Sequence, residues 1–294
     1  MPSVSKVSAW AMQMTHVRAA RTFIEACEAT GIAVLPVKGI VSGRTLYDDP
    51  AERPLTDVDV RVVPRDVRRV VALCRRNGWP IVQYMRSVSN AVAIVDDVAI
   101  DVEAHVGPPG VCDLTIEHAL AHATWSTALG FRCRWPDFTD HGVMLVMNAF
   151  KDKMVGGFEW AIHDLERLPH RVDPRALARA LVDAGISTIG WIVADWMVTV
   201  RKATVWANVR GALGDQSPRL RYVRVMSAAI ARKPAAFFTR VLSRVGSDHV
   251  GNRIRSLAYL VAWQAEALAT ARSKHPFRRG HARPWDPYVR YGNQ

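Results

Sequence analysis

The chain has 294 residues, of which 49% are hydrophobic and 22% are charged. This composition excludes an intrinsically disordered chain and supplies enough apolar residues for one large domain or two of ordinary size. Lysine and arginine outnumber aspartate and glutamate by 39 to 27, giving a formal net charge of +12. Such an excess fits either solvated basic faces or attraction to polyanions such as nucleotides and nucleic acid.

Cysteine usage and the N-terminus indicate a reducing, cytoplasmic setting. No CxxC pair is present, so neither a zinc knuckle nor a disulfide framework is expected. The N-terminus has no charged-then-apolar signal pattern. The most apolar window, 186–200, is too short to cross a bilayer and contains Asp195. We therefore predict a cytoplasmic protein without a membrane partner. The four cysteines are Cys27, Cys74, Cys112 and Cys133.

The first 135 residues mix helical and strand patterns. Apolar positions at helical spacing, alternation of apolar and polar residues, and glycine or proline stops define the elements. They predict a small mixed sheet with helices on one side, an α+β arrangement. The expected helices are 7–29, about 40–47 and 65–78, and the expected strands are 32–39, 57–63, 79–85, 91–96 and 98–104.

After Pro136 the pattern changes to helices alone, which continue to about residue 273. The last stretch, 274–294, is basic and aromatic without periodicity, which fits either nucleic-acid contact or docking onto the chain's own helices. We therefore predict three parts: an α+β domain over 1–135, a helical domain over 136–273 and a basic aromatic tail over 274–294.

The stretch "DVDVRVV" places two carboxylates together. In a strand, residues two apart point the same way, so Asp57 and Asp59 project from one face. Two like charges this close are costly unless a cation lies between them, and Mg²⁺ with oxygen ligands is such a cation. The alternative is a solvent-facing edge strand that Arg53 or Arg61 neutralises.

Three further features favour the metal interpretation. In "LPVKG" a strand runs into Lys38 and Gly39, which offer a point charge and close backbone approach to a phosphate. In "AIDVEAH" Asp101 alternates with Glu103 on another strand, and would join Asp57 and Asp59 if the strands pair. Arg53, in the loop before the first aspartate, is placed to contact a triphosphate or to orient the aspartates.

In this order the features form a recognisable pattern. The segment "PVKGIVSGRTLYDDPAERPLTDVDVRVVP" resembles the DNA polymerase β-like nucleotidyltransferase superfamily. It is most similar to its family of uncharacterised bacterial nucleotidyltransferases, which carry a Lys-Gly turn and an R-x-x-x-D-h-D-h motif. The resemblance covers about residues 30–106. It implies an N-terminal nucleotidyltransferase-like mixed sheet with helices, followed by an all-α domain.

The resemblance also implies roles for the acidic residues. Asp57 and Asp59 would bind Mg²⁺, and Asp101 would complete a two-metal site and act as the base or position it. Glu103 is the rival for the third carboxylate, because the related family tends to follow its third aspartate with x-His, whereas here His105 lies two residues further on.

The implied nucleotide ligands include one departure from the superfamily. Lys38 and Gly39 stand where most members have a Gly-Ser turn, which leaves Ser42 as the candidate to supply the lost hydroxyl. Arg53 and Lys153 would contact the triphosphate, Lys153 because the helical domain closes over the nucleotide in similar proteins. For Lys153, as for Lys151, a solvated charge run is the alternative.

His118 and His122, four residues apart, have the spacing of metal ligands on a helix. The sequence shows neither an HExxH glutamate nor an evident third ligand. We therefore interpret them as surface histidines.

Taken together, the sequence predicts an ATP- or other NTP-binding, magnesium-dependent nucleotidyltransferase that moves an NMP to a hydroxyl acceptor and releases pyrophosphate. The acceptor, a small molecule, a protein side chain or an RNA end, stays open. Two alternatives are a non-catalytic RNA-binding protein on a degenerate nucleotidyltransferase scaffold, and an ordinary α+β domain with structural aspartates.

Overall fold

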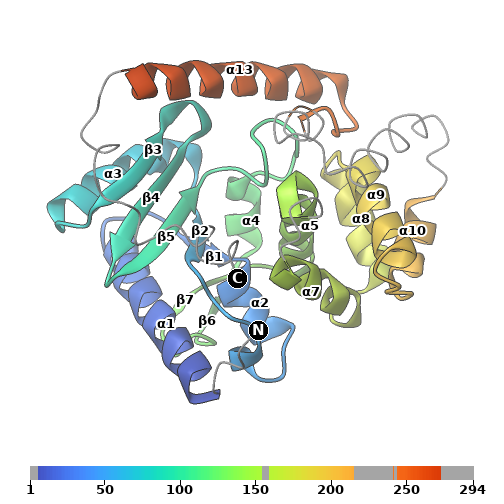
Figure 1. The fold of residues 1–294 in the computed structure, drawn as a ribbon, viewed down its shortest axis with the longest axis horizontal. Coiled ribbons are helices and arrows are strands. Elements are labelled where there is room, and N and C mark those ends of the chain that lie inside the picture. Colours follow the sequence, from blue (N-terminus) through green and yellow to red (C-terminus); the bar gives the residue numbers. More distant parts are fainter. Residues whose placement is uncertain (1–5, 154–158, 215–240, 242–243, 273–294) are drawn as a thin grey trace.

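The structure, a computed structural model, describes residues 6–153, 159–214, 241 and 244–272 (Figure 1). At positions 6, 152, 153 and 270–272 only the backbone is described. The predicted tail, 274–294, lies outside this part of the chain.

A five-stranded mixed sheet forms the centre of the N-terminal half. The strand order is β1-β2-β5-β4-β3, and only the β2–β5 pair is parallel. The predicted strands are all present, four of them shorter than predicted and β4 shifted by one residue. They are β1 (Leu35–Val37), β2 (Val58–Arg61), β3 (Ile81–Met85), β4 (Asn90–Val95) and β5 (Val98–Glu103).

Two helices, α1 (Lys6–Ala29) and α3 (Val67–Arg76), cover one face of this sheet. Alternation along the strands explains why. Val58 and Val60 of β2 and Ile100 of β5 are fully buried in the core that these helices share, whereas the residues between them face the other way. The polar face of the sheet is therefore directed toward the rest of the chain.

The other half of the described chain is helical, as predicted. Its helices share a core around Trp206, which is fully buried and donates its indole hydrogen to the Leu165 carbonyl at 2.8 Å. The helices are α4 (Ile116–His122), α5 (Phe138–Asn148), α7 (Glu159–Arg167), α8 (Pro174–Asp183), α9 (Ser187–Thr199), α10 (Trp206–Leu213) and α13 (Val250–Arg272), with a π-helical turn η4 (Ala149–Lys153) after α5. Short 3-10 turns are η1 (Pro50–Glu52), η2 (Pro64–Asp66), η3 (Arg86–Val88) and η5 (Leu168–His170).

The predicted boundary near residue 136 falls between two elements but not between two cores. A two-stranded hairpin, β6 (Thr124–Ser126) with β7 (Cys133–Trp135), precedes it and was not predicted. The hydrophobic cluster of the helical half also includes Leu35 and Val37 of β1. The sheet and the helices therefore pack as one body, and the division into domains stays a prediction.

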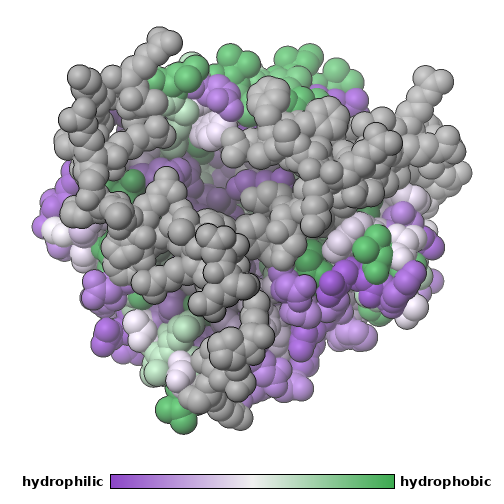
Figure 2. Space-filling view, viewed as in Figure 1, coloured by the Kyte–Doolittle hydropathy of each residue, from purple (hydrophilic) through white to green (hydrophobic). Residues whose placement is uncertain are grey.

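Helix α13 runs along one side of the molecule and joins both halves (Figure 1). Near its start, Asn252 donates to Asp113 at 2.7 Å, while Asp248, just before the helix, accepts from the backbone of Ser187 and Thr188. Toward its end, Glu266 accepts from two backbone N–H groups of η3, each at 2.8 Å. Several apolar side chains of this helix are exposed, and hydrophobic surface lies along the upper edge of Figure 2: Val250, Ile254, Val261 and Leu268 are the exposed residues.

The Asp248 carboxylate acts as a cap for α9 from a distant part of the chain. Burial alone would raise its pKa, but hydrogen bonds from Thr188 and Ser187 lower the pKa below the ordinary value of 3.8. A lowered folded-state pKa stabilises the fold above the unfolded pKa, and this contribution is lost as the pH falls below about 4.

We therefore expect Asp248→Ala to lower the free energy of unfolding by about 1–2 kcal/mol at neutral pH, the usual cost of losing a cap. The difference from wild type should shrink in urea titrations at successively lower pH. Asp183→Ala removes an exposed aspartate at the end of α8 and is the matched control. A difference that stays constant down to pH 3 would contradict the assignment.

Candidate active site

The pairing of β2 with β5 brings the predicted carboxylates together. Asp59 lies directly opposite Asp101, and Arg61 opposite Glu103, in a parallel register. Asp57 precedes β2 by one residue, in a bend outside the strand. The structure therefore brings Asp59 and Asp101 together on the polar face of the sheet, and the place of Asp57 beside them stays a prediction.

Lys38 contributes a cation to this cluster from the end of β1. Its ammonium contacts the Asp59 carboxylate and lies 3.9 Å from Glu103 Oε2. Burial alone would lower the pKa of Lys38, but Asp59 and Glu103 outweigh it and hold the pKa above its usual range. The residue has φ of 54°, a left-handed conformation that is strained for lysine, so the surrounding contacts must hold it there.

Glu103 is surrounded by positive charge. Arg61, which is 3% exposed, contacts its Oε2, and Lys151 Nζ from η4 lies 3.7 Å from its Oε1. Burial would raise the pKa of Glu103, but Arg61, Lys38 and Lys151 together hold it well below its usual range. Glu103 is thus an ionised carboxylate whose partners are already present.

Asp101 differs from Glu103 because little positive charge lies close enough to offset the burial of its carboxylate. Its Oδ1 accepts a hydrogen bond from Asn90 Nδ2 at 3.0 Å. Burial raises the pKa of Asp101 to about 7, with Glu103 and Asp59 adding to the effect against the opposing charges of Lys38 and Arg61. A carboxylate in this state is stabilised by any further cation that binds beside it.

Gly39 of the Lys-Gly turn and Ser42 of the following helix are packed against other residues and are not exposed to solvent. A side chain at Gly39 would meet Leu55 Cδ2 at 3.0 Å and Arg53 at 3.3 Å, so the loop before β2 packs closely against this glycine. Ser42, in helix α2 (Gly39–Thr45), is fully buried, and its hydroxyl has no hydrogen-bond partner in the described part of the chain. Its predicted contact with phosphate stays a prediction.

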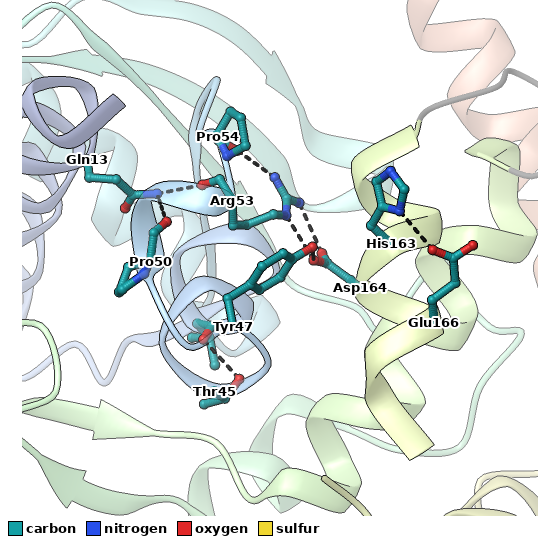
Figure 3. Close-up of polar contacts among 10 residues, drawn as sticks. Gln13, Thr45, Tyr47, Pro50, Arg53, Pro54, His163, Asp164 and Glu166 are labelled. Atoms are coloured by element: carbon teal, nitrogen blue, oxygen red, sulfur yellow. Dashed lines mark hydrogen bonds and ion pairs between the residues drawn. The ribbon is translucent and has the colours of Figure 1, made fainter. Parts of the chain in front are cut away.

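Arg53 makes its main contacts with a residue that sequence reasoning missed (Figure 3). Its Nε and one terminal nitrogen donate to the two oxygens of Asp164 on α7, at 2.9 and 3.0 Å. The Tyr47 hydroxyl donates to the same carboxylate at 2.9 Å. Arg53 also donates to the Pro54 carbonyl at 2.6 Å, while Gln13 holds the Arg53 carbonyl at 2.5 Å.

This arrangement ties the loop before β2 to the helical half. Asp164 is 1% exposed and Arg53 is 12% exposed at the side chain, so the pair is nearly removed from water. The sequence held little signal for it, because residues one or two positions apart on a helix, such as Asp164 with Leu165 and Ile162, do not share a face. An aspartate on a buried helix face requires a cation or a donor.

Lys151 reaches Glu103 from the π-helical turn η4, an element that often marks functional sites. The side chain of Lys153, two residues on, lies outside the described residues, so its predicted contact with a triphosphate stays a prediction.

Comparison with known proteins shows the family of the chain. Residues 7–185, more than half of it, match the family described as uncharacterised nucleotidyltransferase. The chain belongs to this nucleotidyltransferase family. The predicted relation to the nucleotidyltransferase superfamily is thereby confirmed, and the matched region contains both the carboxylate cluster and Asp164. The described fold, a mixed sheet with helices followed by a helical region, agrees with the predicted fold class.

Other comparisons add little. No curated protein matches the chain. A solved structure of the antibiotic-resistance factor ANT(2'')-Ia is similar at 14% sequence identity over 74% of this chain and 98% of that one, with a TM-score of 0.38. A similarity this low carries no argument about substrate.

The contact between Arg53 and Asp164 can be tested through stability. We expect Asp164→Asn to lower the free energy of unfolding by about 3–5 kcal/mol, because it leaves a buried guanidinium without its charge partner. Asp48→Asn, which removes an exposed ion pair with Arg171, is the control and should cost less than about 1 kcal/mol. The double variant Arg53→Met/Asp164→Leu should recover much of the loss. Equal losses in urea unfolding for Asp164→Asn and Asp48→Asn would contradict the assignment.

Proposed function

We propose that the chain is a Mg²⁺-dependent nucleotidyltransferase that moves an NMP from an NTP to a hydroxyl acceptor. The observation that carries this proposal is the register that sets Asp59 opposite Asp101, with Asp57 two residues away. Membership of a nucleotidyltransferase family supports transfer of a nucleotidyl group. The acceptor class is open among a small molecule, a protein side chain and RNA.

The residues present fit a divalent cation. Three carboxylates supply the oxygen ligands that Mg²⁺ prefers. The raised pKa of Asp101 and the Lys38 ammonium held against Asp59 both indicate that this cluster attracts a cation. Asp57, Asp59 and Asp101 would hold the ions, which would neutralise the triphosphate and lower the pKa of the acceptor hydroxyl.

Asp101 suits the role of third carboxylate better than Glu103. Glu103 is engaged by Arg61, Lys38 and Lys151, so a metal would have to compete with three cations already in place. Asp101 has one neutral hydrogen-bond donor, and burial raises its pKa, so a cation that binds beside its carboxylate would meet less competition there. We infer that Asp101 is both ligand and base.

In the proposed reaction the acceptor oxygen bonds to the α-phosphorus of the NTP. The bond from that phosphorus to the oxygen bridging to the β-phosphate breaks, and pyrophosphate leaves. The hydroxyl proton passes to a carboxylate oxygen of Asp101.

The predicted nucleotide ligands divide into two groups. We propose that Lys38 and Lys153 contact the triphosphate directly. Gly39, Ser42 and Arg53 are packed within the turn and loop, so we propose that they position Lys38 and the aspartates.

Within the described residues, no helix is both long and apolar enough to cross a lipid bilayer. The predicted cytoplasmic location stays a prediction, as does contact with nucleic acid through the tail.

The proposal is tested with α-labelled NTPs and Mg²⁺, added to the protein with small-molecule extract, protein lysate or total RNA in separate reactions. Label transfer in at least one reaction is expected, falling by at least about 100-fold in Asp57→Asn and Asp59→Asn because the metal loses a ligand. Asp97→Asn, in an exposed turn, is the control. RNA binding without label transfer, unchanged in both variants, would instead favour the non-catalytic RNA-binding alternative. If no NTP binds with Mg²⁺ and both variants leave every affinity unchanged, the transferase proposal fails.

The rate of label transfer in two variants distinguishes Asp101 from Glu103 as the third carboxylate. Asp101→Asn is expected to lower the rate of label transfer by about 10²–10⁴-fold, the usual contribution of a general base, while NTP still binds. Glu103→Gln should lower it less. The opposite order of rates would assign the role of third carboxylate to Glu103. The rates are compared at saturating NTP, and the folding of each variant is checked by circular dichroism.

A further inference from the structure

Two histidines and an aspartate form a second cluster, built from residues that the proposed transfer site does not use. His118 and His122 lie one turn apart on α4, with ring centroids 4.0 Å apart. Asp140 comes from the first turn of α5, beside α4 in Figure 1. One potential ligand atom from each of the three residues lies within 4.8 Å of the other two.

The spacing is close to what a tetrahedral zinc ion requires. Imidazole nitrogens and carboxylate oxygens bind Zn²⁺ at about 2.0–2.2 Å, which sets neighbouring ligand atoms about 3.4 Å apart. His122 Nδ1 and Asp140 Oδ2 are 3.5 Å apart, so these two atoms already have the spacing of neighbouring zinc ligands. His118 is exposed, and a side-chain rotation suffices to bring its nitrogen to the same spacing.

Asp140 supplies the independent sign that a ligand is missing. The residue is only 7% exposed, and its buried Oδ2 accepts no hydrogen bond in the described part of the chain. Other buried carboxylates here are fully engaged, as Asp164 is by Arg53 and Tyr47. This oxygen lies 3.5 Å from His122 Nδ1, too far for a full hydrogen bond, so a buried carboxylate oxygen is left incompletely satisfied beside an imidazole that can bind a metal.

We propose that His118, His122 and Asp140 bind a Zn²⁺ ion that joins α4 to α5. Two imidazoles and one carboxylate match the ligand preference of zinc, and the exposed side of the histidines leaves the fourth position to water. Because α5 continues into η4, which carries Lys151 to Glu103, the ion steadies the helix that supports the carboxylate cluster.

The test uses metal binding and needs no nucleotide. Full-length protein stripped with a chelator is titrated with Zn²⁺ against a chromophoric competitor, and with Co²⁺, whose four-coordinate complexes absorb strongly in the visible. To remove the proposed magnesium ligands from the readout, the titrations are carried out in the Asp57→Asn/Asp59→Asn background.

One Zn²⁺ per chain is expected, with the visible Co²⁺ bands of a four-coordinate site and a rise in Tm on adding zinc. His118→Ala and His122→Ala, at exposed positions, should each weaken Zn²⁺ binding at least about 100-fold and abolish the bands, as should Asp140→Asn. His170→Ala, an exposed histidine away from the cluster, should bind as the parent does. Absence of stoichiometric binding, or binding that all three ligand variants leave unchanged, would overturn the proposal.

Discussion

Asp59 and Asp101 are held face to face by the backbone hydrogen bonds of the parallel β2–β5 pair, and much of the structure follows from that constraint. A slip of one residue in the register would turn one carboxylate into the core between α1 and α3. Because the register fixes the like charges, the surroundings must balance them. Lys38, Arg61 and Lys151 converge from three different elements to do so.

Some of the basic residues that contribute to the net charge are buried. Arg61 is 3% exposed, and the side chains of Lys38 and Arg53 are 15% and 12% exposed. In the structure these basic residues are paired with internal carboxylates. The overall excess of +12 is therefore a poor guide to nucleic-acid binding, because part of each charge count lies in internal pairs.

Local patterns predicted the parts of this protein that depend on neighbours in sequence. Alternation predicted the strands β2 and β5, because a strand has a fixed period. Contacts between distant segments could not be predicted, since Arg53 and Asp164 are 111 residues apart and only the fold brings them together. Asp140 was missed as a neighbour of His122 for the same reason. The hairpin of β6 and β7 was missed because three-residue strands are too short to show alternation.

Helix α13 is another element whose contacts join segments that are distant in sequence. It is attached near residue 252 to the loop before α4 and near residue 266 to η3, beyond β3. With a rise of 1.5 Å per residue, the two attachment points are kept about 21 Å apart. The helix therefore acts as a spacer of fixed length across the molecule. Any motion that changed the distance between the loop before α4 and η3 would have to break one of the two attachments or bend the helix.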